Sequence, residues 1–196
     1  RRQQDRIRLF SQGARFAVQD GKVSEVDSLA GIVAGKRLPE QWGSGESRES
    51  ADFFDAKADL QALLTATGAA GEFSFEAATL SCLHPGRAAR VRRSGVQAGW
   101  IGELHPRLVR ELGFTHTPVL FEIDVVALRV TVPQGREISR FPQMRRDLAV
   151  VLPENVTFSA LRERVVLSGS SLLQNVRLFD IYRGAGIEKG RKSIAL

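Results

Sequence analysis

Apolar residues alternate with polar ones along several short stretches of the chain, and each such stretch predicts a β-strand. In the first two thirds, the pattern predicts strands over residues 7–18, 28–34, 72–77, 88–93, 96–104 and 119–125, with a continuation over 128–132. In the last third, it predicts strands over 147–152, 176–183 and 191–196. Apolar spacing and start signals predict helices over 52–67, 105–112 and 157–167.

The helices carry recognisable ends. Asp52 or Asp55 can cap the first, and Gly68 can stop it. The second begins at His105-Pro106, with proline in its first turn. The third can be capped by Thr157. The apolar stripes that should face a core are Phe53, Leu60, Leu63 and Leu64 in the first helix, and Phe158, Leu161 and Val165 in the third.

Glycine-containing pairs predict the turns. Asp20-Gly21 and Ser94-Gly95 are typical of hairpins. Residues 82–87 contain Pro85-Gly86, which predicts a turn rather than a regular element. Residues 35–50 are polar and predict a loop, which we expect Trp42 to pin to the body of the domain.

The order of the elements predicts an α+β protein with two modules. Residues 1–132 form an antiparallel-sheet domain, residues 133–140 a linker, and residues 141–196 a second domain. The second domain reads strand, helix, strand, strand, which is the first part of a ferredoxin-like split βαβ fold. We therefore expect it to be incomplete, with a further helix and strand beyond Leu196.

The positive charge is concentrated in the second domain. The net charge of the chain is +6, and counting residues gives +1 for residues 1–135 and +5 for residues 136–196. A basic surplus on one module is typical of nucleic-acid binding, although a solvated basic face would have the same composition.

The sequence offers little enzymatic chemistry of its own. Its three histidines, His84, His105 and His116, lack the spacing of metal ligands, so we expect no metal site. His84 and His105 precede prolines and suit capping or surface roles. Cys82, the single cysteine, is expected to be a buried apolar residue. No apolar run is long enough to span a membrane, and we expect a cytoplasmic protein.

The second domain has a sheet face that suits single-stranded RNA. Alternation places Leu148, Val150 and Leu152 toward the helix, and Ala149 on the other side. Tyr182 can stack on an unpaired base, and small side chains let bases approach. Arg183, Arg191 and Lys192 are candidate phosphate contacts on physical grounds. The alternative is that Tyr182 only closes the edge of the sheet.

Blocks of residues in both modules resemble the bacterial phenylalanyl-tRNA synthetase beta chain. In the second module these blocks are Phe141-Pro142, 146–149 (RDLA), 179–184 (FDIYRG) and 190–195 (GRKSIA). In the first module they are 52–57 (DFFDAK), 84–89 (HPGRAA), 102–106 (GELHP) and 121–124 (FEID).

This resemblance implies a function. The first module would be a catalytically inactive class II synthetase-like core domain that packs on a catalytic alpha chain in an α2β2 enzyme. The second would be the anticodon-binding domain, with Ala149, Tyr182 and Ser193 at the anticodon contacts of tRNA(Phe). The whole ligase would use ATP and Mg²⁺ to attach phenylalanine to its tRNA, with no cofactor bound by these residues and no membrane partner.

Two departures bear on activity. Residues 119–132 lack the glycine-rich motif that carries the ATP-binding arginine of an active class II site, so we expect no active site here. Ser11 stands where the family often has glutamate. A rival hypothesis is a free-standing RNA-binding or docking module without ligase activity, which would have no need for the first-module blocks.

Overall fold

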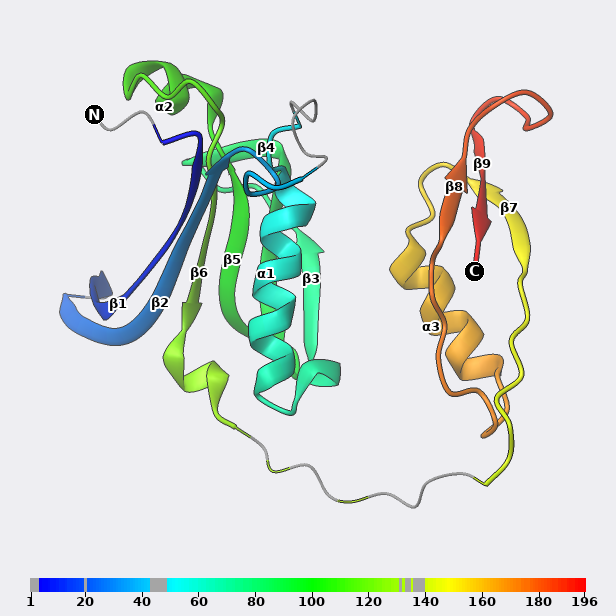
Figure 1. Ribbon diagram of the computed structural model, residues 1–196. Helices are drawn as coiled ribbons and strands as arrows, with labels where there is room; N and C mark the ends of the chain where they lie inside the picture. Colours follow the sequence, from blue (N-terminus) through cyan, green and yellow to red (C-terminus); the bar gives the residue numbers. More distant parts are fainter. Residues whose placement is uncertain (1–3, 20, 43–48, 131, 133–134, 136–139) are drawn as a thin grey trace. The chain divides into compact units, whose positions relative to one another are not determined.

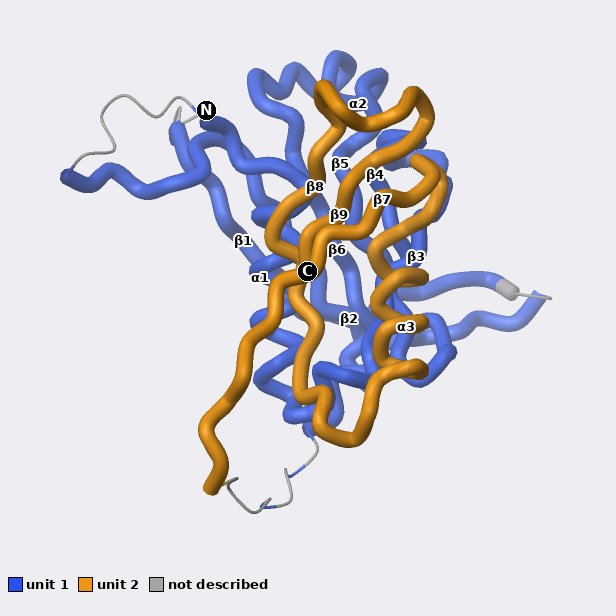
Figure 2. Tube along the Cα trace, turned by 90° about the vertical axis from the view of Figure 1, so that its right-hand side faces the viewer, with its two compact units in different colours: residues 1–135 blue, residues 136–196 orange. Residues whose placement is uncertain are grey.

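The computed structural model describes residues 4–19, 21–42, 49–130, 132, 135 and 140–196. Contacts divide the chain into two compact units, unit 1 (residues 1–135) and unit 2 (residues 136–196), coloured separately in Figure 2. Each unit has its own antiparallel sheet, so the α+β prediction is confirmed. The division falls within the predicted linker 133–140, most of which lies outside the described residues.

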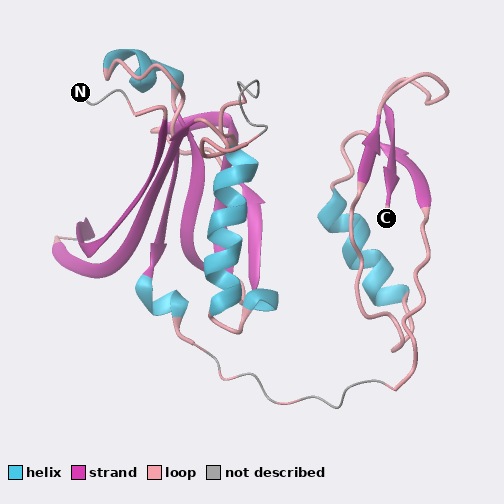
Figure 3. Ribbon diagram, viewed as in Figure 1, coloured by secondary structure: helices cyan, strands magenta, loops and turns pink. Residues whose placement is uncertain are grey.

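Unit 1 is built on a six-stranded sheet in the order β1-β2-β6-β5-β4-β3, and every neighbouring pair is antiparallel. Helix α1 lies along one face of this sheet (Figures 1 and 3). The elements are β1 (Arg6–Gln19), β2 (Lys22–Gly35), α1 (Phe53–Ala66), the 3-10 helix η1 (Ala70–Glu72), β3 (Phe73–Ala77), β4 (Leu83–Arg93), β5 (Val96–Leu104), α2 (Pro106–Glu111), β6 (Val119–Asp124) and the 3-10 helix η2 (Val125–Leu128).

Helix α1 begins and ends where its sequence signals predict. The Asp52 side chain accepts hydrogen bonds from the backbone N–H groups of Phe54 and Asp55, at 2.8 and 3.1 Å. Asp55 in turn accepts from the Asp52 N–H, which completes a capping box. Beyond the C-cap residue Thr67, Gly68 adopts a φ of +74°, the left-handed conformation that commonly ends a helix.

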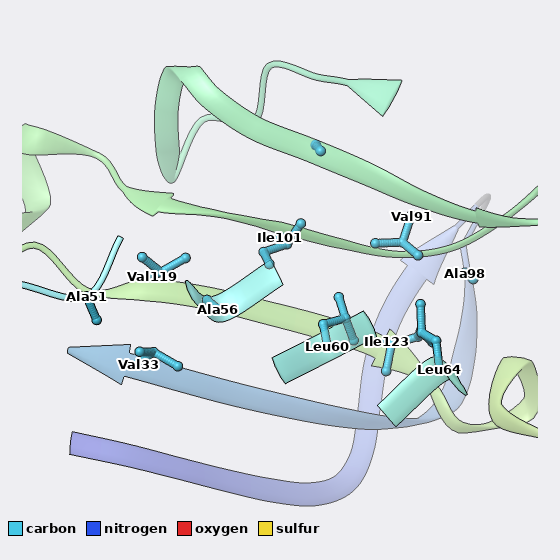
Figure 4. Packing of buried hydrophobic residues seen from close by; sticks show 11 residues of the cluster. Val33, Ala51, Ala56, Leu60, Leu64, Val91, Ala98, Ile101, Val119 and Ile123 are labelled. Atoms are coloured by element: carbon cyan, nitrogen blue, oxygen red, sulfur yellow. The ribbon is translucent and has the colours of Figure 1, made fainter. Parts of the chain in front are cut away.

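The core of unit 1 forms between α1 and the sheet (Figure 4). Ala56, Leu60 and Leu64 form the buried side of the helix and cluster with Ile101 and Ile123 of the sheet. Complete burial of a leucine side chain stabilises the fold by about 1.5–3 kcal/mol relative to exposure. The predicted apolar stripe is therefore confirmed for Leu60 and Leu64, which are buried. Phe53 and Leu63 are partly buried and pack against the edge of the core.

The two hairpins predicted from the turn signals are present, as far as the described residues extend. β1 and β2 pair without a break from Arg6 opposite Gly35 to Gln19 opposite Lys22, so Gly13 does not interrupt the ladder. Asp20 of the first predicted turn lies outside the described residues. In the second, Ser94 and Gly95 have φ angles of +49° and +83°, as a two-residue type I′ turn requires.

Three expectations about the strands and loops of unit 1 are wrong. Residues 83–87 belong to β4 rather than to a turn, and a register shift between Leu83 and Ala88 absorbs Pro85-Gly86. Trp42 is fully exposed and therefore does not pin its loop. The described part of 128–132 contains no strand, because β6 ends at Asp124 and the 3-10 helix η2 follows it to Leu128.

Unit 2 contains β7 (Ala149–Pro153), α3 (Phe158–Ser168), β8 (Asp180–Tyr182) and β9 (Arg191–Ala195), and its sheet has the order β7-β9-β8. β9 pairs antiparallel with both neighbours, so the strands on either side of α3 are separated by a third strand. That is the split βαβ arrangement predicted from the sequence.

The order of the unit 2 elements is as predicted, but some of their first and last residues differ from prediction. Thr157 caps α3 by accepting a hydrogen bond from the Ala160 N–H at 3.2 Å, as predicted. The strand predicted over 176–183 is regular only from Asp180 to Tyr182. Leu148, which was expected to face the helix, is 55% exposed just before β7 begins. Among the described residues of both units, no helix is long and apolar enough to cross a membrane.

Candidate nucleic-acid interface

One face of the unit 2 sheet is covered by α3. The central strand places Ile194 opposite Val150 on one side and Ile181 on the other, and Ile194 is 1% exposed. In α3 only Phe158, Leu161 and Val165 are half-buried, which confirms the predicted apolar stripe. This covered face is the small core of unit 2.

The opposite face carries a different set of side chains. Residues directly opposite on antiparallel strands share a face, and residues two apart continue it. Ser193 lies opposite both Val151 and Tyr182, and Ala195 lies opposite both Ala149 and Asp180. These side chains are exposed or half-buried. We call this surface the open face; it consists of Ala149, Val151, Asp180, Tyr182, Arg191, Ser193 and Ala195.

The three predicted base contacts therefore lie on the same surface. Tyr182 and Ser193 are direct cross-strand neighbours, and Ala149 lies in the adjacent row. Because β8 is an edge strand, the tyrosine also lies at the margin of the sheet. Tyr182 is 47% exposed, so its ring has a surface available for stacking.

A glycine two residues downstream makes room for the ring of Tyr182. A Cβ atom placed on Gly184 would collide with the ring and hydroxyl of Tyr182. The hydroxyl donates a hydrogen bond to the carbonyl oxygen of Ala185 at 3.2 Å, which fixes the far end of the ring. The sequence Tyr182-Arg183-Gly184 thus sets the orientation of the aromatic group locally.

The three predicted phosphate contacts have different environments. Arg183 pairs with Glu154 at 2.7 Å and Arg191 with Glu188 at 3.5 Å, in both cases at the surface. Lys192 points to the covered side, is 8% exposed, and donates from Nζ to the carbonyl oxygen of Glu154 at 2.7 Å. Among these three, Lys192 is buried, whereas Arg183 and Arg191 are exposed.

Asp180 belongs to the open face and was not among the predicted contacts. Its carboxylate lies in the row of Ala149 and Ala195, adjacent to the row of Tyr182. A carboxylate there can accept hydrogen bonds from the N–H groups on the edge of an unpaired base. The alternation Asp180-Ile181-Tyr182 is the sequence signal that could have identified it, since it puts the carboxylate and the ring on one side.

Three of the four blocks of the first module, 52–57, 84–89 and 102–106, contribute to the lining of one cavity in unit 1. The cavity has a volume of about 500 Å³, and its lining includes Phe53, Lys57 and Phe75, together with Arg87 and Glu103. Both carboxylate oxygens of Glu103 accept from Arg87 Nη1, at 3.0 and 2.9 Å. Desolvation lowers the pKa of the half-buried Lys57, whose Nζ lies 4.8 Å from the centre of the Phe75 ring.

The remaining candidate groups have structural or surface roles. His84 Nδ1 accepts from the Gly86 N–H, and His105 Nδ1 accepts from the Arg107 N–H at the start of α2, which confirms the capping prediction. Cys82 is exposed, so the expectation that it is buried was wrong. Within the described ranges, no group of three His, Cys, Asp or Glu side chains could hold a metal ion.

Comparison with known proteins assigns both parts of the chain. The family model "Phenylalanyl tRNA synthetase beta chain CLM domain" matches residues 1–125, and "Ferredoxin-fold anticodon binding domain" matches residues 139–196. Phenylalanine–tRNA ligase beta subunits of Pseudomonas putida and Methylococcus capsulatus are 43% and 44% identical over 100% of this chain, and that of Nitrosospira multiformis is 41% identical over 99%. The chain spans about a quarter (24%) of the length of each of these relatives.

We predict that Gly184→Ala displaces the Tyr182 ring without unfolding unit 2. The added methyl group must push the ring aside, and the ring lies at the surface, so the free energy of unfolding should change by less than about 1 kcal/mol. NMR of the ring protons can follow this, because the 196 residues contain one tyrosine. Ala185→Ser, which keeps the accepting carbonyl, is the control. Unchanged ring signals in Gly184→Ala would contradict the packing described above.

We predict that Lys192→Ala destabilises unit 2 by about 1.5–3 kcal/mol, the usual contribution of a hydrogen bond from a charged group. Urea unfolding measures the effect. Lys189→Ala is the matched control, because Lys189 is exposed and forms no ion pair within the described residues, so its loss should change stability by less than about 0.5 kcal/mol. Equal stability of the two variants would show that the bond to Glu154 contributes nothing.

Proposed function

Because the chain belongs to the family of phenylalanine–tRNA ligase beta subunits, we propose that it is a non-catalytic part of such a ligase and binds the anticodon region of tRNA(Phe). In this proposal the assembled enzyme uses ATP and Mg²⁺ to attach phenylalanine to its tRNA. The residues of this chain bind neither cofactor, and the enzyme acts in the cytoplasm.

The observation that carries the proposal is the composition of the open face. Tyr182 offers a ring on which a base can stack, and the adjacent Ser193 hydroxyl can donate to or accept from the edge of that base. Ala149 and Ala195 are small enough to let neighbouring bases approach the strands. Asp180 adds an acceptor beside them. An aromatic ring with small and polar neighbours on an exposed sheet suits unstacked loop bases.

The charged residues around this face take different parts in the proposal. Arg183 and Arg191 can exchange their exposed carboxylate partners for phosphates, because a surface ion pair contributes only about 0–1 kcal/mol. Lys192 would have to break a buried hydrogen bond to do the same. We therefore assign phosphate contacts to the two arginines and leave Lys192 in the core of unit 2.

In the same proposal, unit 1 is the domain that docks on a partner chain. We take its antiparallel sheet with α1 on one face to be a class II synthetase-like domain that packs on the catalytic alpha chain of an α2β2 enzyme. The β1–β2 hairpin exposes an apolar surface on one face, where Phe10, Phe16, Val18 and Val23 are 65–78% exposed. Exposed apolar patches of this kind mark protein interfaces. The family match over residues 1–125 favours this proposal over a free-standing RNA-binding module.

We predict that Tyr182→Ala weakens binding of an anticodon stem-loop RNA by about 1–3 kcal/mol, which is the usual contribution of a stacked base. The measurement is a fluorescence titration with the full-length beta chain in its complex. Tyr182→Phe, which keeps the ring, should retain most of the affinity. If the alanine variant binds as tightly as the unmodified protein, the stacking role of Tyr182 is wrong.

We predict that the full-length chain copurifies with a phenylalanyl-tRNA synthetase alpha chain, and that only the complex charges tRNA(Phe). Aminoacylation assays on the complex and on each chain alone test this. Charging by the beta chain alone would contradict its non-catalytic role. RNA binding without any complex would favour the free-standing module.

A further inference from the structure

The basic side chains of unit 2 differ in whether a carboxylate already neutralises them. Arg183 and Arg191 form ion pairs, and Lys192 is buried against a carbonyl oxygen. The other basic side chains in the described part of unit 2 are exposed and have no ion-pair partner there: Arg140, Arg145, Arg146, Arg162, Arg164, Arg177 and Lys189. These unpaired groups are the ones able to bind an external anion without losing an existing contact.

Three of these unpaired arginines precede the strands at one end of the sheet. β7 and β8 both run antiparallel to β9, so the residues preceding both strands lie at the end where β9 finishes. The ladder extends to Leu148, which exchanges backbone hydrogen bonds with Leu196 at 3.0 and 2.9 Å. Arg145 and Arg146 come just before this pair. Arg177 comes three residues before β8, on the opposite edge at the same end.

The opposite end of the sheet is already neutralised. Glu154 and Glu188 lie there, paired with Arg183 and Arg191. Asp147 lies beside Arg146 in sequence but forms no ion pair within the described residues. The unpaired positive charge is thus at the end of the sheet nearest Ala149 and Asp180, away from the Arg183 end.

We propose that Arg145 and Arg146, the Arg145–Arg146 tract, bind the sugar-phosphate backbone of the anticodon stem, with Arg177 supporting them from the other edge. This inference rests on the proposed function, in which the open face holds the loop bases. An arginine guanidinium can bind a phosphate with two parallel hydrogen bonds. At about 3.3 Å per extended residue, the tract lies at most about 13 Å along the chain from Ala149, close enough to contact phosphates of an RNA that covers the Ala149 end of the sheet.

The test is the salt dependence of RNA binding by the full-length beta chain in its complex with the alpha chain. The probe is a fluorescent anticodon stem-loop of tRNA(Phe), titrated between 50 and 200 mM salt. Each lost phosphate contact reduces the magnitude of the slope of log affinity against log salt by about 0.7–0.9. Arg145→Ala/Arg146→Ala should therefore reduce the slope by about 1.5 and weaken binding roughly tenfold at 0.1 M salt.

A control variant with two arginine substitutions on α3 distinguishes the effect of a local phosphate contact from the effect of net charge. Arg162 and Arg164 are exposed and belong to the helix that covers the other face. Arg162→Ala/Arg164→Ala removes the same charge and should leave the slope nearly unchanged. Arg145→Lys/Arg146→Lys should restore most of the slope. An equal loss in the α3 variant would overturn the proposal, because net charge would then explain the effect.

A second RNA probe, a single-stranded loop heptamer, distinguishes contacts to the stem from contacts to the loop. Removing the tract should cost little affinity for a single-stranded loop heptamer and much more for the stem-loop, whereas Tyr182→Ala should weaken both. If Tyr182→Ala weakens binding and the tract variant does not, the tract proposal is wrong and the proposed function stands. If neither substitution matters, the proposed anticodon interface itself is wrong.

Discussion

The register of β9 is the constraint on which the candidate interface depends. Its side chains alternate between the covered core, with Ile194 and Lys192, and the open face, with Ser193 and Ala195. A slip of β9 by one residue against its two neighbours would exchange these two sets, exposing Ile194 and burying a serine. The burial of Ile194 disfavours that slip, because the slip would expose its apolar side chain to water. The packing of the unit 2 core thus determines which side chains form the open face.

Unit 1 uses the same division of a sheet into two faces on a larger scale. α1 covers the side that bears Ile101 and Ile123, and the capping box at Asp52 sets where the helix begins. The outer β1–β2 hairpin extends an apolar surface that these residues do not cover. A stable body with an exposed apolar hairpin is consistent with a subunit that completes its packing on a partner, as the proposed function requires.

Local signals predicted the elements well where chain neighbours decide them. Thr157, Asp52 and His105 cap the helices they were expected to cap, and Ser94-Gly95 forms its turn. The errors occur where distant segments compete with a local rule. Pro85-Gly86 predicted a turn, but pairing with β5 continues β4 across it through a register shift. Trp42 was expected to pin its loop to the body of the domain, yet nothing among the described residues packs over it.

The sequence by itself determined the two modules, the types and order of their elements, the alternation of faces within each strand, and the family. The pairing of the strands then brought Ala149, Tyr182 and Ser193 to one face. Alternation and capping are properties of adjacent residues, so they can be followed along the chain. Only the tertiary structure decided which charges remain available. Lys192 donates a hydrogen bond to a carbonyl group 38 residues away and Arg183 pairs with a carboxylate 29 residues away. Arg145 and Arg146 have no such partner within the described residues. Whether a charged side chain is paired depends on which distant strands are brought together, and that is a property of the folded chain.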